Sequence, residues 1–183
     1  AFDALVHSIE SFVSSIANEF TKTMAKLGAE KILNGMLGFN KNSLKSLESI
    51  AIGSSYSIIS LMHSEQSLVG ASSYQLAIYK KINHALCGAI YINKSLLFLK
   101  KNKNTDINEL IEHLYSKKII ANNTINSLIK TIDMIKKRYK INQVVLSKEE
   151  IKFLARKIVK MPMLNYTSPK INIRDVQEFL RSE

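Results

Sequence analysis

Ala85-Leu86-Cys87-Gly88-Ala89-Ile90-Tyr91-Ile92 opens the most apolar part of the chain, which extends to Leu99. A helix that is apolar on nearly all sides is usually buried at the centre of a fold. Asn93-Lys94-Ser95 interrupts the run before it reaches the 18 or so apolar residues that a membrane-spanning helix needs. We therefore expect a long central helix over about 67–101 and no transmembrane segment.

On both sides of this helix, apolar residues recur at steps of three and four, which is the period of an amphipathic helix. The fold class is therefore predicted to be all-α, an irregular multi-helix bundle of about seven or eight helices. We expect two long helices in the first 101 residues, over 2–27 and 67–101, and shorter capped helices after them. Ser147 and Glu150 have the spacing of a capping box, and Pro162 limits the helix that they begin.

The middle of a further predicted helix, over about 44–63, contains the small residues Ala51-Ile52-Gly53-Ser54-Ser55. Because glycine costs about 1 kcal/mol against alanine in a helix, we expect a second helix to pack closely there. The chain is interpreted as a single helical domain, 1–183, with subdomains 1–79 and 80–183.

The two parts differ in net charge. The whole chain has a net charge of +11. Residues 1–79, with five Lys and six acidic residues, have a net charge of −1, so residues 80–183 have +12. The excess in 80–183 is typical of polyanion binding, here RNA through 94–160. The candidate residues are Lys130, Lys136, Lys137, Arg138, Lys140, Lys148, Lys152 and Arg156. Alternatively, the preponderance of Lys over Arg reflects an AT-rich genome, because nucleic-acid surfaces favour Arg.

Motifs for chemistry are missing from the sequence. It contains no His-Glu-x-x-His, no Glu-x-x-His and no glycine-rich phosphate loop. Glu109 and His113 could provide two metal ligands, but an exposed ion pair is the commoner role. His63 and His84 are interpreted as structural, and the single cysteine, Cys87, as a buried small hydrophobe. We accordingly predict no catalytic, cofactor-binding or metal-binding residues and no cofactor.

These observations favour a non-enzymatic helical domain for protein interaction or structure, with a protein partner. It would belong to a larger assembly or be a secreted or translocated factor, since the first residue is not Met and a processed or excised chain is expected. RNA binding through 94–160 is the first alternative. Membrane-surface interaction by the amphipathic helix 2–27 is the second, although its polar face is poor in Lys.

Overall fold

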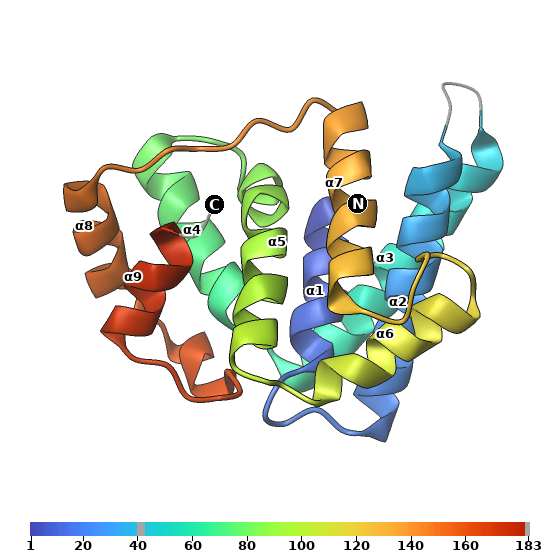
Figure 1. Cartoon of the computed structure of the whole chain (residues 1–183), viewed down its shortest axis with the longest axis horizontal. Helices are drawn as coiled ribbons and strands as arrows, with labels where there is room; N and C mark the ends of the chain where they lie inside the picture. Colours follow the sequence, from blue (N-terminus) through green and yellow to red (C-terminus); the bar gives the residue numbers. More distant parts are fainter. Residues whose placement is uncertain (40–42, 182–183) are drawn as a thin grey trace.

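The computed structural model describes residues 1–39 and 43–181, and within these ranges it contains nine α-helices, one 3-10 helix and no strand. The all-α prediction is confirmed. Figure 1 labels the α-helices. In chain order the elements are α1 (Phe2–Phe12), α2 (Glu19–Gly38), α3 (Leu44–Ser64), α4 (Leu68–Lys80), α5 (His84–Lys101), α6 (Asp106–Ser116), α7 (Ile125–Arg138), α8 (Lys148–Ile158), η1 (Pro162–Tyr166) and α9 (Ile173–Arg181).

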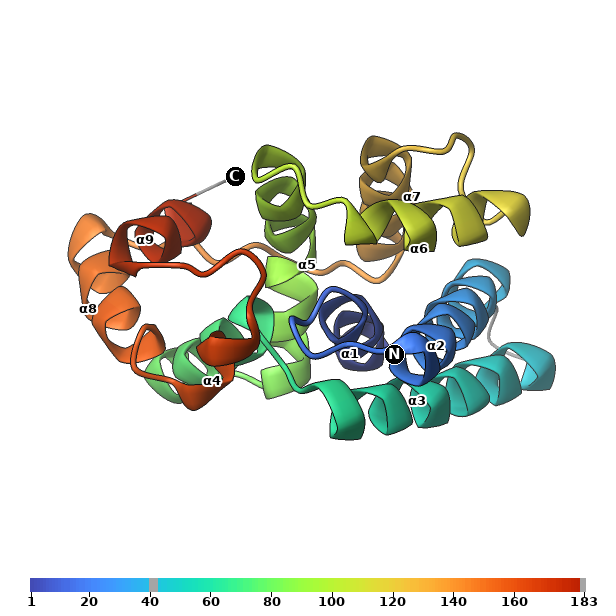
Figure 2. The same cartoon turned by 90° about the horizontal axis from the view of Figure 1, so that it is seen from below.

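Helix α5 lies at the centre, as its apolar sequence predicts. It packs against α1 and α7 on one side and against α4 and α9 on the other, and both views show this arrangement (Figures 1 and 2). Its side chains Cys87, Ile92 and Leu96 are fully buried, and burial raises the pKa of the Cys87 thiol to about 11. In the described part of the chain, no helix is both long enough and apolar enough to cross a membrane.

The predicted helix 2–27 is wrong, because the chain breaks between α1 and α2. Asn18 is the N-cap of α2, and its side chain accepts a hydrogen bond from the Thr21 amide while the Thr21 hydroxyl accepts one from the Asn18 amide. This reciprocal cap begins a new helix in the middle of one apolar stripe. The single amphipathic helix that the membrane-surface alternative required does not exist.

The predicted helix 67–101 is also wrong, because α4 ends at Lys80 and α5 begins at His84. Lys81 has a left-handed backbone (φ 53°), the Ile82 amide donates to the Ala77 carbonyl, and the Asn83 side chain caps α5. These contacts form a Schellman ending. The same ending, with Lys at positive φ, recurs after α5, α6 and α7, at Lys103, Lys118 and Lys140.

Small residues bring α1, α2 and α3 into close contact. The hydroxyls of Ser8 and Ser57 are 2.6 Å apart, and a Cβ added to Gly53 would lie 2.8 Å from Ile32 Cγ1 and 2.9 Å from the Gly28 carbonyl oxygen. The close packing predicted around Gly53 is confirmed. The buried hydroxyls of Ser8 and Ser57 form a hydrogen bond with each other, so both have a partner.

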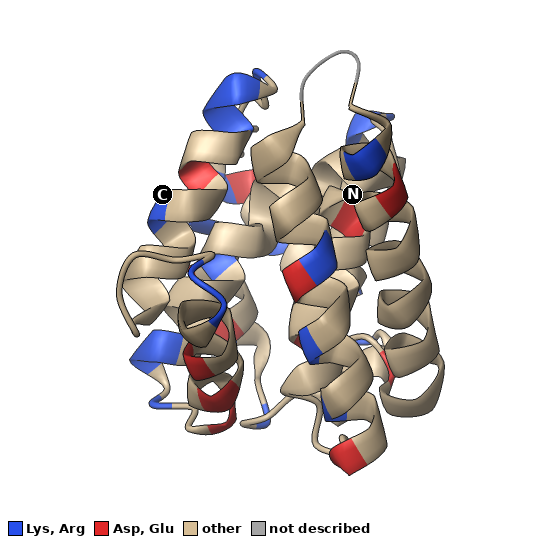
Figure 3. Ribbon diagram, turned by 90° about the vertical axis from the view of Figure 1, so that its right-hand side faces the viewer, with Lys and Arg blue, Asp and Glu red and all other residues tan. Residues whose placement is uncertain are grey.

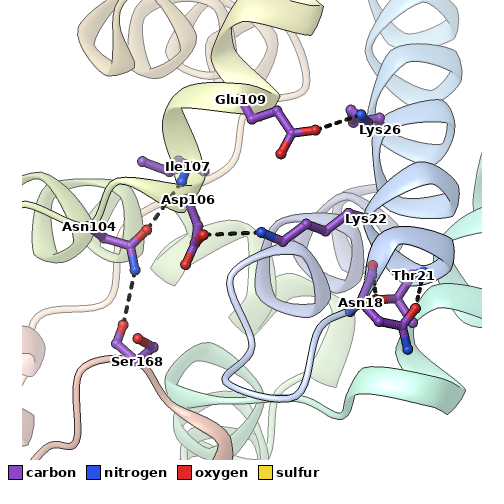
Figure 4. A network of polar contacts seen from close by, with 9 residues as sticks. All are labelled: Asn18, Thr21, Lys22, Lys26, Asn104, Asp106, Ile107, Glu109 and Ser168. Atoms are coloured by element: carbon purple, nitrogen blue, oxygen red, sulfur yellow. Dashed lines mark hydrogen bonds and ion pairs between the residues drawn. The ribbon is translucent and has the colours of Figure 1, made fainter.

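Ion pairs join α6 to α2 at the surface, and we call them the charge ladder. Lys22 pairs with Asp106 at 3.1 Å and Lys26 with Glu109 at 2.8 Å (Figure 4). The third rung, His113 with Glu30, has 2.8 Å between the nitrogen and the oxygen. Glu109 and His113 therefore each bind a different residue of α2 and do not form a metal-ligand pair with each other.

Candidate metal centre

One face of α1 carries three chemically active side chains. Asp3, His7 and Glu10 are spaced i, i+4 and i+7, so they lie above one another along the helix. The helix is mostly buried, and this face is turned towards the start of α4 and the start of α5. The fold thus directs a polar stripe into the interior instead of towards solvent.

The carboxylate of Asp3 lies between two imidazoles. Its Oδ2 is 3.6 Å from His7 Nε2, and its Oδ1 is 3.6 Å from Nε2 of His84, the first residue of α5. These distances exceed those of ordinary hydrogen bonds. Two donors that are each about 2.1 Å from one metal ion lie about 3.0–3.6 Å apart when the angle at the ion is 90–120°. Both separations therefore suit a shared ion better than direct hydrogen bonds.

Two further side chains complete the surroundings. The amide nitrogen of Gln66, in the turn between α3 and α4, lies 3.1 Å from His7 Nε2. The ring of Tyr74 stacks on the ring of His84 with 4.3 Å between centroids. His84 Nδ1 is buried and makes no hydrogen bond within the described residues. Its orientation is therefore held by the Tyr74 ring.

Burial controls the protonation of His7. Desolvation lowers the pKa of His7, and the neighbouring His84 adds to this effect, while the Asp3 carboxylate opposes it. At neutral pH the ring is accordingly uncharged. An uncharged imidazole has a lone pair to offer, which is the form that binds a metal ion.

Glu10 fastens this site to α4. Its carboxylate is only 1% exposed and accepts hydrogen bonds from the amides of Ser67, Val69 and Gly70 and from the Ser67 hydroxyl. Burial raises the pKa of Glu10, and these four hydrogen bonds oppose that shift. A carboxylate at a helix N-terminus satisfies amides that have no partner within the helix. Glu10 therefore fixes the turn that carries Gln66.

The donors form a chain, His7–Asp3–His84, with the carboxylate in the middle. Within residues 1–39 and 43–181, no three His, Cys, Asp or Glu side chains yet converge as a closed metal site. Asp3 approaches each imidazole through a different carboxylate oxygen, Oδ2 towards His7 and Oδ1 towards His84. The arrangement offers one carboxylate oxygen and two imidazole nitrogens to a divalent cation.

An apolar cavity of about 540 Å³ opens at the same end of the bundle. Phe2 and Ala85, the neighbours of Asp3 and His84 in the chain, contribute to its wall together with Leu86, Met36 and other apolar side chains. Its described lining includes no Lys or Arg. The size and the apolar lining of the cavity suit an uncharged carbon chain.

The Lys and Arg candidates lie elsewhere and on two separate helices. Helix α7 and helix α8 stand on opposite sides of α5 (Figures 1 and 2), and the side shown in Figure 3 carries both basic and acidic residues. Lys136 is buried, and Arg138 donates to the carbonyls of Met36 and Leu37 at the end of α2. The exposed candidates are Lys130, Lys137, Arg138 and Lys140 at or just after α7 and Lys148, Lys152 and Arg156 at α8. RNA binding through these residues stays a prediction.

Sequence reasoning missed the side chains that the fold brings together. His84 was interpreted as structural, and Asp3, His7 and Gln66 were not proposed as site residues. The signal that could have found them is the i, i+4, i+7 spacing of Asp3, His7 and Glu10 on one helix face. His63, in contrast, is exposed on α3 and packs edge-on against Phe20.

Comparison with known proteins identifies the family. The model of the iron-containing alcohol dehydrogenase family, C-terminal region, matches residues 1–183. The 4-hydroxybutyrate dehydrogenase of Clostridium kluyveri is 26% identical over 165 residues, which cover 86% of this chain and 44% of that protein. The chain therefore spans about half the length of the relative that it matches.

Solved structures share the fold. An iron-containing alcohol dehydrogenase from Thermococcus thioreducens superposes with a TM-score of 0.85 at 16% identity, over 100% of this chain and 50% of that one. A sulfoacetaldehyde reductase from Bifidobacterium kashiwanohense, solved in complex with NAD+, gives 0.83 at 16% identity, over 98% and 47%. Here too the similarity covers about half of the longer chain.

The interpretation as a non-enzymatic protein-binding domain, complex subunit or secreted factor is wrong. The family model that matches all 183 residues describes dehydrogenases, and the named relative is a dehydrogenase as well. Short motifs do not contain the candidate site, because it joins residues up to 81 positions apart, from Asp3 to His84. This chain belongs to the iron-containing alcohol dehydrogenase family, whose C-terminal region it matches along its whole length.

Proposed function

We propose that this chain is the metal-binding part of an oxidoreductase that interconverts an alcohol and the corresponding carbonyl compound. The observation that carries the proposal is the Asp3 carboxylate placed 3.6 Å from an imidazole nitrogen on each side. Membership of a family of iron-containing dehydrogenases supports it. Asp3, His7 and His84 would hold the iron.

The donor chemistry fits this metal. Two histidines and one carboxylate form the donor set of many non-haem Fe(II) sites, in which further positions stay open for a substrate. Iron held there would act as a Lewis acid that polarises the oxygen of the alcohol or carbonyl group. The negative charge of Asp3 would partly neutralise the cation, and the neutral His7 ring would offer its lone pair.

The other side chains position these ligands. Tyr74 keeps the His84 ring in place by stacking, and Glu10 keeps the turn before α4 against α1. We assign the carbon chain of the substrate to the apolar cavity lined by Phe2 and Ala85, the chain neighbours of Asp3 and His84. The hydride acceptor is proposed to be a nicotinamide dinucleotide, as in the sulfoacetaldehyde reductase complex with NAD+. We propose that the dinucleotide binds to the part of such a protein that corresponds to the half of the relatives not matched by this chain.

Metal binding tests the proposal directly. The chain is loaded with Fe(II) without oxygen, dialysed, and analysed for bound iron by elemental analysis. One ion per chain is expected, and Asp3→Asn, His7→Ala and His84→Ala should each lower the affinity by at least about tenfold. His63→Ala is the matched control, because His63 lies on α3 away from Asp3.

The pH dependence adds a second check. Because burial lowers the pKa of His7, protons compete less with the metal at this ligand than at a histidine of ordinary pKa. Iron binding should therefore weaken as the pH falls, because protonated imidazoles offer no lone pair to the ion. A chain that binds no iron at pH 7, or one that loses as much iron through His63→Ala as through His84→Ala, would refute the proposed site.

A further inference from the structure

Gln66 is the side chain nearest to the lone pair of His7 that a metal would use. Its amide nitrogen lies 3.1 Å from His7 Nε2, while the Asp3 carboxylate is 3.6 Å from the same atom on another side. Gln66 thus contacts the nitrogen of His7 through which the proposed ion would bind. It is a neutral side chain with one oxygen and one nitrogen at its tip.

The separation has the size expected for two ligands of one ion. Two donors at about 2.1 Å from an ion and at 90° to each other lie about 3.0 Å apart. The oxygen and nitrogen of a glutamine amide occupy nearly the same volume, and a half-turn about the last torsion exchanges them. Turned in this way, Gln66 presents Oε1 to the ion beside His7 Nε2.

We propose that Gln66 is a fourth metal ligand through Oε1. This inference rests on the proposed metal site of Asp3, His7 and His84 and extends it. The donor set is then one carboxylate oxygen, one amide oxygen and two imidazole nitrogens. Glu10 makes this ligand possible, because its hydrogen bonds to Ser67, Val69 and Gly70 hold the adjoining turn in place.

The amide oxygen has a consequence for metal preference. Carboxylate and carbonyl oxygens suit Mn(II) and Mg(II), whereas imidazole nitrogens suit Zn(II) and Cu(II) as well as iron. With two oxygens and two nitrogens, the site favours Fe(II) and Mn(II) relative to Zn(II) more than a site with three imidazoles would. Gln66→His should therefore shift the preference towards Zn(II).

Cobalt(II) gives a readout that does not depend on activity, because its visible absorption reports the number and kind of its ligands. The intact chain is titrated with Co(II), and dissociation constants and spectra are compared among wild type, Gln66→Ala, Gln66→Glu and the control Gln143→Ala. Gln66→Ala should weaken Co(II) binding by at least about tenfold and change the spectrum. Gln66→Glu should restore binding, because it returns an oxygen to the same place, and Gln143→Ala should match wild type.

The outcomes separate this inference from the metal site itself. If wild type and Gln66→Ala bind Co(II) with equal affinity and identical spectra, Gln66 is only a hydrogen-bond partner of His7 and the inference is wrong, while the three-ligand site stands. If wild type binds no Co(II), both the Gln66 ligand and the three-ligand site are wrong. Circular dichroism of Gln66→Ala establishes that it is folded, and a folded Gln66→Glu that binds no better than Gln66→Ala also overturns the ligand role.

Discussion

Helix α1 and helix α6 are both joined to their neighbours by polar side chains, but at different depths. The polar seam of α1, which comprises Ser8, Glu10 and Ser11 with their partners, is fully buried. The charge ladder of α6 lies at the surface, and the side chain of Glu109 is 52% exposed. Exposed ion pairs stabilise little, whereas a buried donor that loses its acceptor costs about 1–3 kcal/mol.

The difference shows which contacts hold the candidate metal centre. The seam connects α1 to the start of α4 and to α3, and so it determines where Asp3 and His7 lie relative to Gln66. The charge ladder joins α6 to α2, and its ion pairs include no residue of the candidate metal centre. Removing one contact from each region should therefore give effects of very different size.

The largest effect is expected from Glu10→Ala. The change leaves three backbone amides and the Ser67 hydroxyl buried without an acceptor, and it should lower the free energy of unfolding by roughly 3 kcal/mol or more. Denaturant titration measures this loss. A loss below about 1 kcal/mol would show that water enters the polar seam and accepts the hydrogen bonds that the carboxylate accepted.

A smaller effect is expected from Gly53→Ala, in the packing beside the seam. The new Cβ would lie within 3 Å of Ile32, Lys31 and the Gly28 carbonyl, so overpacking should cost roughly 1–3 kcal/mol. Gly88→Ala is the matched control. Its Cβ would meet Asp3 and Val6 only at 3.5 Å or more, so this change should leave stability equal or raise it by up to about 1 kcal/mol. Equal losses in both variants would contradict the close contact of α2 and α3.

The smallest effect is expected in the charge ladder. Lys26→Ala should cost less than about 1 kcal/mol, because Glu109 is largely solvated and salt screens the pair. Unfolding at low salt and at about 1 M salt should show the difference between wild type and variant shrinking as salt rises. A loss comparable to that of Glu10→Ala would mean that the ladder, and not the seam, dominates.

The sequence predicted the helical class, the central position of α5 and the close packing at Gly53, because these depend on local apolar spacing. The capping box of Ser147 and Glu150 is also confirmed, since it needs only two residues three apart. The break at Lys81 was missed because the apolar stripe continues across it, and a left-handed lysine has no marker in the sequence.

The candidate site could be predicted only in part. Asp3 and His7 lie four residues apart on one helix, so the sequence alone predicts that they share a helix face. Gln66 follows α2 and α3 in the chain, and His84 follows α4 as well. Their approach depends on tertiary packing, in particular on the buried Glu10, and no local pattern contains it.

The Schellman endings with lysine leave room for engineering thermal stability. Four helices end on Lys81, Lys103, Lys118 and Lys140 at positive φ, a conformation in which a side chain meets steric hindrance and glycine does not. Replacing each by glycine should raise the melting temperature, with a gain of a few tenths to about 1 kcal/mol per site after the greater freedom of glycine in the unfolded chain is deducted. The four sites follow four different helices, α4, α5, α6 and α7, and we expect their gains to add. The quadruple variant would also lower the net charge from +11 to +7 and leaves Asp3, His7 and His84 unchanged.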